Sequence, residues 1–164
     1  MYFYIDGYNL LFSWGEGKAS LESQRAQLIQ WMQGKFQRMS LSGTIVFDGS
    51  HRRDEESGKS YVPPLEIAFT PKGQSADEYI IEKIEGHKHG KSITVITNDQ
   101  HLKRHARSCG AKTMSNDSFL FWLFKKNKKR KAKQNYDIRE SPEYEARLLK
   151  LFEDRLKENL EKDF

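Results

Sequence analysis

The sequence has 164 residues, a formal net charge of +5, 37% hydrophobic and 12% aromatic residues, and one cysteine. The length fits one domain, since domains hold roughly 100–200 residues, and the aromatic content excludes disorder throughout. The lone cysteine excludes an intramolecular disulfide, no apolar run reaches the roughly 18–20 residues that span a bilayer, and the N-terminus lacks the basic start of a signal peptide. We therefore expect a cytoplasmic protein with no membrane segment.

The first third of the chain predicts two buried strands separated by a helix. Residues 2–6 are aromatic and β-branched and precede a glycine, which indicates a strand and a turn. Apolar residues at helical spacing predict an amphipathic helix over residues 21–39, with Ser20 as its N-cap. Residues 43–48 indicate the second buried strand.

The middle of the chain predicts a loop, a strand and a capped helix. Residues 49–60 are polar and charged, which is typical of an exposed loop. Residues 65–70 follow two prolines and indicate a strand. Ser75 and Glu78 have the spacing of a capping box, which predicts a helix over residues 75–85.

The remaining segments continue the alternation of strands and helices. Residues 92–97 predict a strand, residues 100–108 a short helix and residues 110–114 a weaker strand. The all-apolar residues 119–124 indicate a core helix. A last amphipathic helix is expected over residues 141–160, where a serine and a proline begin it and leucines form its apolar stripe.

This order of elements predicts the fold class. Strands that alternate with helices favour right-handed crossovers and a mostly parallel sheet with helices on both faces. We expect an α/β fold, a three-layer α/β/α sandwich, over residues 1–124. A basic stretch and an amphipathic helix follow as a C-terminal extension over residues 125–164.

Acidic residues stand where the predicted strands end. Asp6 closes the first strand, Asp48 the second, and Asp99 follows the strand at 92–97, while Asp77 and Glu78 lie in the first helical turn after the third strand. Ligands of open α/β sheets bind outside the carboxyl ends of the strands, so these acids share the edge where chemistry is expected. Grouped carboxylates repel one another unless a cation neutralises them, and their oxygens suit Mg²⁺ or Mn²⁺.

Each of these acids also has a structural interpretation. Asp6 and Asp48 precede glycines and suit Asx-turns, and Asp77 suits the positive end of a helix dipole. Glu78 completes the capping box, and either Asp99 or Asn98 suits the N-cap of the next helix. Their joint occurrence at one edge shifts the balance toward a metal site.

Four motifs along the chain carry a resemblance to a known family. They are DGYN at Asp6–Asn9, IVFDG at Ile45–Gly49, FTPKGQSADEYI at Phe69–Ile80 and VITND at Val95–Asp99. In order and spacing this set resembles the NYN-domain nucleases of the PIN-like superfamily, in particular the bacterial YacP-like ribonucleases. The resemblance covers residues 1–124 and implies a PIN-like fold, divalent-metal-dependent cleavage of RNA and, within this branch, cleavage of translated mRNA on the ribosome.

The resemblance also implies roles for individual residues. Asp6, Asp77 and Asp99 match the acidic, metal-binding cluster of the family, and Asn9 matches its accompanying amide. These four residues are the catalytic candidates, and Asp48 and Glu78 are further candidate metal ligands. No side-chain general base is evident, so water activated by Mg²⁺ or Mn²⁺ is the expected nucleophile. His101 and His105 lack the glutamate of an HExxH motif, which favours surface or phosphate contact.

The positive charge of the chain is local. Residues 125–133 hold seven basic groups and no acid, whereas residues 1–124 have a net charge of +1 and residues 137–164 of −3. A local basic patch points to a polyanion such as RNA, and the alternative is a solvated linker. The candidate nucleic-acid-binding residues are Tyr8, Arg52, Arg53, Lys125, Lys126, Lys128, Lys129, Arg130, Lys131 and Lys133.

Two functional classes follow from these patterns. The first is a metal-dependent endoribonuclease whose acidic edge is the active site and whose basic stretch anchors RNA, mRNA or the ribosome. The second is a non-catalytic RNA- or ribosome-binding module with a vestigial acidic site. Metal binding at Asp6, Asp77 and Asp99 discriminates between them.

Overall fold

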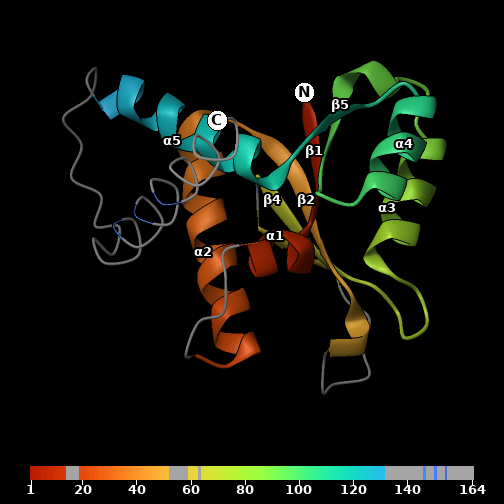
Figure 1. The fold of residues 1–164 in the computed structure, drawn as a ribbon, viewed down its shortest axis with the longest axis horizontal. Helices are drawn as coiled ribbons and strands as arrows, with labels where there is room; N and C mark the ends of the chain where they lie inside the picture. The colour runs from red at the N-terminus through yellow and green to blue at the C-terminus, as the bar shows by residue number, and fades with distance from the viewer. Residues whose placement is uncertain are drawn as a thin grey trace. The chain divides into compact units, whose positions relative to one another are not determined.

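The computed structural model describes residues 1–13, 19–51, 59–62 and 64–131, together with the single residues 146, 150 and 154. The chain divides into two compact units, Met1–Phe119 and Leu120–Phe164. The first unit holds the whole sheet and the acidic edge (Figure 1). None of the helices in the described ranges has the length and apolarity needed to cross a bilayer.

The sheet of the first unit has six strands, five of them parallel. Its order is β3-β4-β2-β1-β5-β6, and β3 pairs antiparallel with β4 at one edge. This confirms the mostly parallel sheet. The strands are β1 (Tyr2–Asp6), β2 (Ser42–Phe47), β3 (Lys59–Val62), β4 (Leu65–Phe69), β5 (Ile93–Ile96) and β6 (Lys112–Met114).

The structure has five α-helices in its described ranges, and two of them begin and end at the predicted residues. The helices are α1 (Gly7–Ser13), α2 (Leu21–Met39), α3 (Ala76–Glu85), α4 (Gln100–Ser108) and α5 (Asn116–Lys131), and two short 3₁₀ turns are η1 (Gly49–His51) and η2 (Gly90–Ser92). The bounds of α2 and α4 are those predicted. The Ser20 cap of α2 and the Ser75–Glu78 capping box of α3 are also confirmed.

Three local predictions need correction. The expected turn after β1 is the helix α1, which begins at Gly7 without any intervening loop residue. The expected loop over residues 49–60 contains η1 and the start of β3. The core helix is longer than residues 119–124, because α5 begins at Asn116 and continues into the basic stretch as far as Lys131.

The last predicted helix, over residues 141–160, lies almost entirely outside the described residues. The three described positions within it, 146, 150 and 154, are helical and exposed. The domain boundary at residue 124 stays a prediction.

Residue alternation along the strands assigns helices to the two faces of the sheet. Tyr4, Val46 and Val95 form a buried cluster with the apolar residues of α3 and α4. Phe3 points to the opposite face, where its ring contacts Phe36 of α2 edge-on at a centroid distance of 5.9 Å. Figure 1 shows α3 and α4 side by side on one face and α1 and α2 on the other. The three layers of the predicted sandwich are therefore present.

Two turns at the carboxyl edge of the sheet are in close backbone contact. Gly49 follows β2, and its N–H donates a hydrogen bond of 3.0 Å to Thr70 Oγ1, just after β4. Thr70 Oγ1 in turn donates to the carbonyl of Gln74, at 2.7 Å, before α3 begins. A Cβ atom on residue 49 would lie 1.9 Å from the carbonyl oxygen of Thr70, so this position requires glycine.

We predict that Gly49→Ala lowers the free energy of unfolding by about 2 kcal/mol or more, because the turns after β2 and β4 must separate. Urea denaturation measures this change. Gly34→Ala is the matched control, because its Cβ would meet only the flexible end of Arg38 at 3.3 Å, inside α2. Alanine there raises stability by up to about 1 kcal/mol. Equal free energies of unfolding for the two variants would contradict the close approach of Gly49 to the Thr70 carbonyl.

Candidate active site

Three aspartates meet at the carboxyl edge of the sheet, on the face covered by α3 and α4. Asp6 is the last residue of β1, and its side chain alternates to the same face as Tyr4. Asp77 lies in the first turn of α3, and Asp99 is the N-cap of α4. Since both helices run back from this edge, their N-terminal ends bring these two carboxylates toward Asp6.

The pKa of Asp6 is raised by burial and also by the two neighbouring aspartates. Asp6 is 8% exposed. Burial, the charge of Asp77 and a hydrogen bond with the Asp77 side chain raise the pKa of Asp6 from 3.8 to about 7, and Asp99 contributes further. The N–H of Asn9 opposes this rise, donating a long hydrogen bond of 3.4 Å to Asp6 Oδ1. Around neutral pH, Asp6 and Asp77 therefore hold a proton in the absence of a cation.

The pKa of Asp77 is also raised, chiefly by burial. Asp99 and Glu78 add to the rise, whereas the hydrogen bond with Asp6 and the charge of His101 oppose it. His101 is exposed in the first turn of α4, two residues after the Asp99 cap. The sequence predicts surface or phosphate contact for His101, whereas its nearness to Asp77 comes from the packing of α3 beside α4.

Asp99 combines a structural contact with its place in the cluster. Its Oδ1 accepts a hydrogen bond of 2.8 Å from the N–H of Leu102, which confirms the N-cap interpretation. Oδ2 takes no part in that cap. One carboxylate can therefore cap α4 and still present an oxygen to a ligand.

Asp48 and Glu78 have local structural partners. Asp48 Oδ1 accepts from the N–H of Ser50 at 2.8 Å, which forms the expected Asx-turn. Glu78 Oε2 accepts from the N–H of Ser75 at 3.0 Å in the capping box. The charges that act on Asp6 come from Asp77 and Asp99, not from these two residues. Glu78 acts on Asp77 instead, and the roles of Asp48 and Glu78 as metal ligands stay predictions.

Asn9 ties three segments together behind the acidic edge. Its Oδ1 accepts hydrogen bonds of 2.9 Å from the Asn98 N–H and from Asn116 Nδ2, and one of 3.4 Å from Thr97 Oγ1. The backbone N–H of Asn116 completes the tie by donating to Asn98 Oδ1 at 2.9 Å. Asn9 Oδ1 therefore holds these segments in place by hydrogen bonds within the protein. If Asn9 also orients a water or a phosphate, its Nδ2 is the side-chain atom that would do so.

The structure also locates part of the predicted RNA-binding set. Tyr8 is 5% exposed, and its hydroxyl accepts a hydrogen bond of 2.9 Å from Arg25, so its ring belongs to the core and offers no open stacking face. Phe12 is 58% exposed and stacks on Tyr8. Lys125 and Lys126 are exposed on α5. Arg52, Arg53 and Lys133 lie outside the described residues.

The donor oxygens of Asp6, Asp77 and Asp99 do not all lie within 4.8 Å of one another. Within the part of the chain that the structure describes, the group whose donor atoms all lie within 4.8 Å of one another is Glu85, His105 and Cys109, at the other ends of α3 and α4. The case for a cation at the acidic edge therefore rests on the hard oxygen donors and on the raised pKa of Asp6.

Comparison with solved structures supports the fold. A crystal structure of Rae1 (YacP) from Bacillus subtilis has a TM-score of 0.64 and 24% sequence identity, and the match covers 99% of this chain and 93% of that chain. A mutant form of Rae1 (YacP) has a TM-score of 0.63 and 23% identity, with 100% of both chains covered. No curated protein matches the chain.

A largely parallel α/β domain with aspartates grouped at its carboxyl edge is the architecture implied by the resemblance to PIN-like nucleases. The chain belongs to the YacP-like NYN domain family, which matches residues 3–163. This membership places it in a nuclease family that acts on RNA.

We predict that Asp6→Asn stabilises the cation-free protein at neutral pH. The folded protein binds a proton at Asp6 more tightly than the unfolded chain does, so the contribution of this group to stability falls as pH rises from about 4 to about 7. The neutral asparagine removes this loss and gains about 1–3 kcal/mol above pH 7, with little difference near pH 4. Urea denaturation in EDTA at several pH values measures it. If the free energy of unfolding changed with pH in the same way for the wild type and the variant, the raised pKa of the buried Asp6 carboxyl would be contradicted.

Proposed function

We propose that this protein is an endoribonuclease that depends on Mg²⁺ or Mn²⁺ and hydrolyses RNA phosphodiester bonds at the edge formed by Asp6, Asp77 and Asp99. The observation that carries the proposal is the buried Asp6 carboxyl, whose pKa is raised to about 7 by burial and by two neighbouring aspartates. Such mutual repulsion lowers stability unless a cation neutralises it. Membership in the YacP-like NYN family supports RNA as the substrate.

The donor set fits a hard divalent cation. Three carboxylates offer the oxygen ligands that Mg²⁺ and Mn²⁺ prefer, and one or two carboxylates with retained waters are enough for Mg²⁺. Asp6 and Asp77 would hold the cation after loss of their shared proton, and Asp99 would contribute the oxygen that its cap leaves over. When bound, the cation supplies activation of water and stabilisation of charge on the phosphoryl group.

The chain's own residues contribute position and local charge. Asn9 fixes the end of β1 relative to the residues that follow β5, so Asp6 and Asp99 keep their separation. His101 lies near enough to Asp77 to lower its pKa, and its exposed ring can also approach a phosphate oxygen. These contacts pre-organise the acidic edge before RNA arrives.

We predict that Asp77→Asn and Asp99→Asn each lower RNA cleavage at least about a hundredfold, as loss of one contact to the transition state does. Asparagine caps a helix as well as aspartate does, so Asp99→Asn keeps the fold and tests charge alone. The assay incubates full-length protein with single-stranded RNA, structured RNA or translating ribosomes, in Mn²⁺ or EDTA.

The matched control is Glu22→Gln, which removes an exposed carboxylate from the first turn of α2 and should retain cleavage. Full activity of Asp77→Asn in Mn²⁺, or cleavage in EDTA, would reject the metal mechanism. Specific binding of RNA by the wild type without cleavage would favour the non-catalytic module instead.

We further propose that the basic stretch at residues 125–133 anchors RNA, with translated mRNA on the ribosome as the substrate context. The stretch is helical through Lys131 rather than a linker throughout. Within α5, Lys126 Nζ lies 4.3 Å from the centroid of the Trp122 ring, and Lys125 Nζ lies 5.7 Å from that of Phe121. A run of lysines on a helix is suited to phosphate contacts without base specificity.

We predict that the triple variant K128Q/K129Q/K131Q binds single-stranded RNA more weakly and with a flatter salt dependence. The plot of log K against log salt concentration has a negative slope, and loss of three phosphate contacts makes this slope less steep by about 2. Fluorescence anisotropy at several salt concentrations measures the slope. The control K88Q/K91Q/K112Q removes the same charge from exposed positions elsewhere and should leave the slope unchanged. Identical slopes in both variants would show that the stretch only connects two segments.

A further inference from the structure

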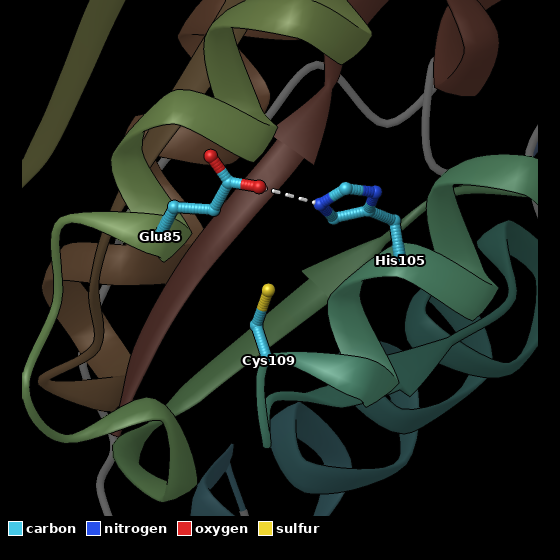
Figure 2. A group of neighbouring side chains, drawn as sticks. All are labelled: Glu85, His105 and Cys109. Carbon is cyan, nitrogen blue, oxygen red and sulfur yellow. Dashed lines mark hydrogen bonds and ion pairs between the residues drawn. The ribbon is translucent and has the colours of Figure 1, made fainter.

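Three metal-ligating side chains converge where α3 and α4 end. Glu85 is the last residue of α3, His105 lies in the last turn of α4, and Cys109 is the residue that follows α4 as its C-cap. His105 Nε2 and Glu85 Oε1 are 2.8 Å apart, and the donor atoms of all three residues lie within 4.8 Å of one another. Figure 2 shows the Cys109 sulfur directed toward the Glu85–His105 hydrogen bond.

We propose that Glu85, His105 and Cys109 form a second metal site, which binds Zn²⁺ or a chemically similar divalent cation and joins the C-terminal ends of α3 and α4. Thiolate, imidazole and carboxylate are the three ligand types that zinc takes from proteins. Water fills the fourth position of the tetrahedron. The mixed sulfur, nitrogen and oxygen set disfavours Mg²⁺, which requires hard oxygen ligands.

The observed spacing fits such a site after small side-chain movements. Zinc lies about 2.0–2.3 Å from nitrogen, oxygen and sulfur ligands, so tetrahedral donors are separated by roughly 3.3–3.6 Å. The distance of 2.8 Å between His105 Nε2 and Glu85 Oε1 must therefore increase slightly. The Cys109 sulfur, which lies within 4.8 Å of both atoms, must move to about 3.5 Å from them. Metal binding displaces the proton shared by imidazole and carboxylate and the proton of the thiol.

Helix geometry favours a cation at this place. His105 and Cys109 are four residues apart, so both side chains lie on one side of the end of α4. The C-terminal end of a helix carries a partial negative charge, which a cation stabilises, and two helices end here. Glu85 adds a full negative charge at the same end of α3, where the helix dipole alone would disfavour it.

The site is accessible from solvent. The side chain of Glu85 is 56% exposed and that of His105 is 35% exposed, which leaves an entry path and room for a water ligand. The cluster is separate from the acidic edge, because Asp77 lies near the start of α3 and Glu85 at its end, about 12 Å away along the axis. The proposal therefore stands whether or not the acidic edge cleaves RNA.

Cobalt titration of the full-length protein tests the site. Co²⁺ replaces zinc in such sites, and a bound thiolate gives a charge-transfer band in the near ultraviolet. Cys109 is the only cysteine of the chain, so any band from the monomeric protein originates from this residue. We expect the band to appear with stoichiometric Co²⁺, to disappear when Zn²⁺ is added, and to persist in excess Mg²⁺.

Single substitutions identify the ligands. Loss of an outer-shell partner alone costs about 10–100-fold in metal affinity, so Glu85→Gln and His105→Gln should weaken Co²⁺ binding by at least about tenfold. Cys109→Ser should abolish the band. His89→Gln is the control, since this exposed histidine lies outside the group and should leave affinity unchanged.

Two outcomes overturn the proposal. Absence of the band from the wild type would mean that Glu85 and His105 only join the helices through a hydrogen bond. A band with the same affinity in Glu85→Gln and His105→Gln would mean that Cys109 binds the ion with other groups. RNA cleavage is not a readout of this experiment, so its result is independent of the proposed nuclease activity.

Discussion

The parallel pairing of β1 with both of its neighbours is the constraint on which the acidic edge depends. Tyr2 pairs with Ser42 of β2 and with Ile93 of β5, and this register continues to the ends of the strands. All three strands therefore end together, and β4 pairs in parallel with β2 as far as Phe69. The residues that lead from β4 into α3 and from β5 into α4 thus leave the sheet at the same edge as Asp6. An antiparallel neighbour would place the aspartates at opposite edges of the sheet. The parallel order of the strands thus brings the aspartates to one edge, whatever interactions their side chains then make.

Long periodic segments and capped helices could be predicted from the sequence, and elements set by tertiary contact could not. The apolar spacing and the Ser20 cap predict α2, and the pair Asn98 and Asp99 predicts the start of α4, where the structure selects Asp99 as the cap. The short helix α1 follows β1 directly, and Gly7 is required because a Cβ would lie 2.5 Å from the Phe47 ring, a contact that no local pattern reveals. Strand β3 is four residues long and follows a charged stretch of the sequence, so its pairing with β4 rather than its own composition forms it.

The same distinction applies to the candidate site. The positions of Asp6, Asp77 and Asp99 relative to the predicted strands are enough to predict that they share one edge, because the carboxyl ends of parallel strands lie at the same edge of a sheet. The engagement of Asn9 Oδ1 by three donors, the burial of Tyr8 and the nearness of His101 to Asp77 depend on side-chain packing between distant segments. The meeting of Glu85 with His105 depends on two helix ends whose adjacency no residue spacing encodes.

The hydrogen bonds of Asn9 couple the local unfolding of three segments. One amide oxygen joins the start of α1, the residues after β5 and the first residue of α5, and Asn116 Oδ1 is buried there without a partner among the described residues. Opening of any one segment breaks a hydrogen bond to Asn9, and release of the buried Asn116 amide breaks two, to the Asn9 carbonyl and to Asn9 Oδ1. Fluctuations behind the acidic edge are therefore cooperative, and the three segments open and close as one unit of local unfolding.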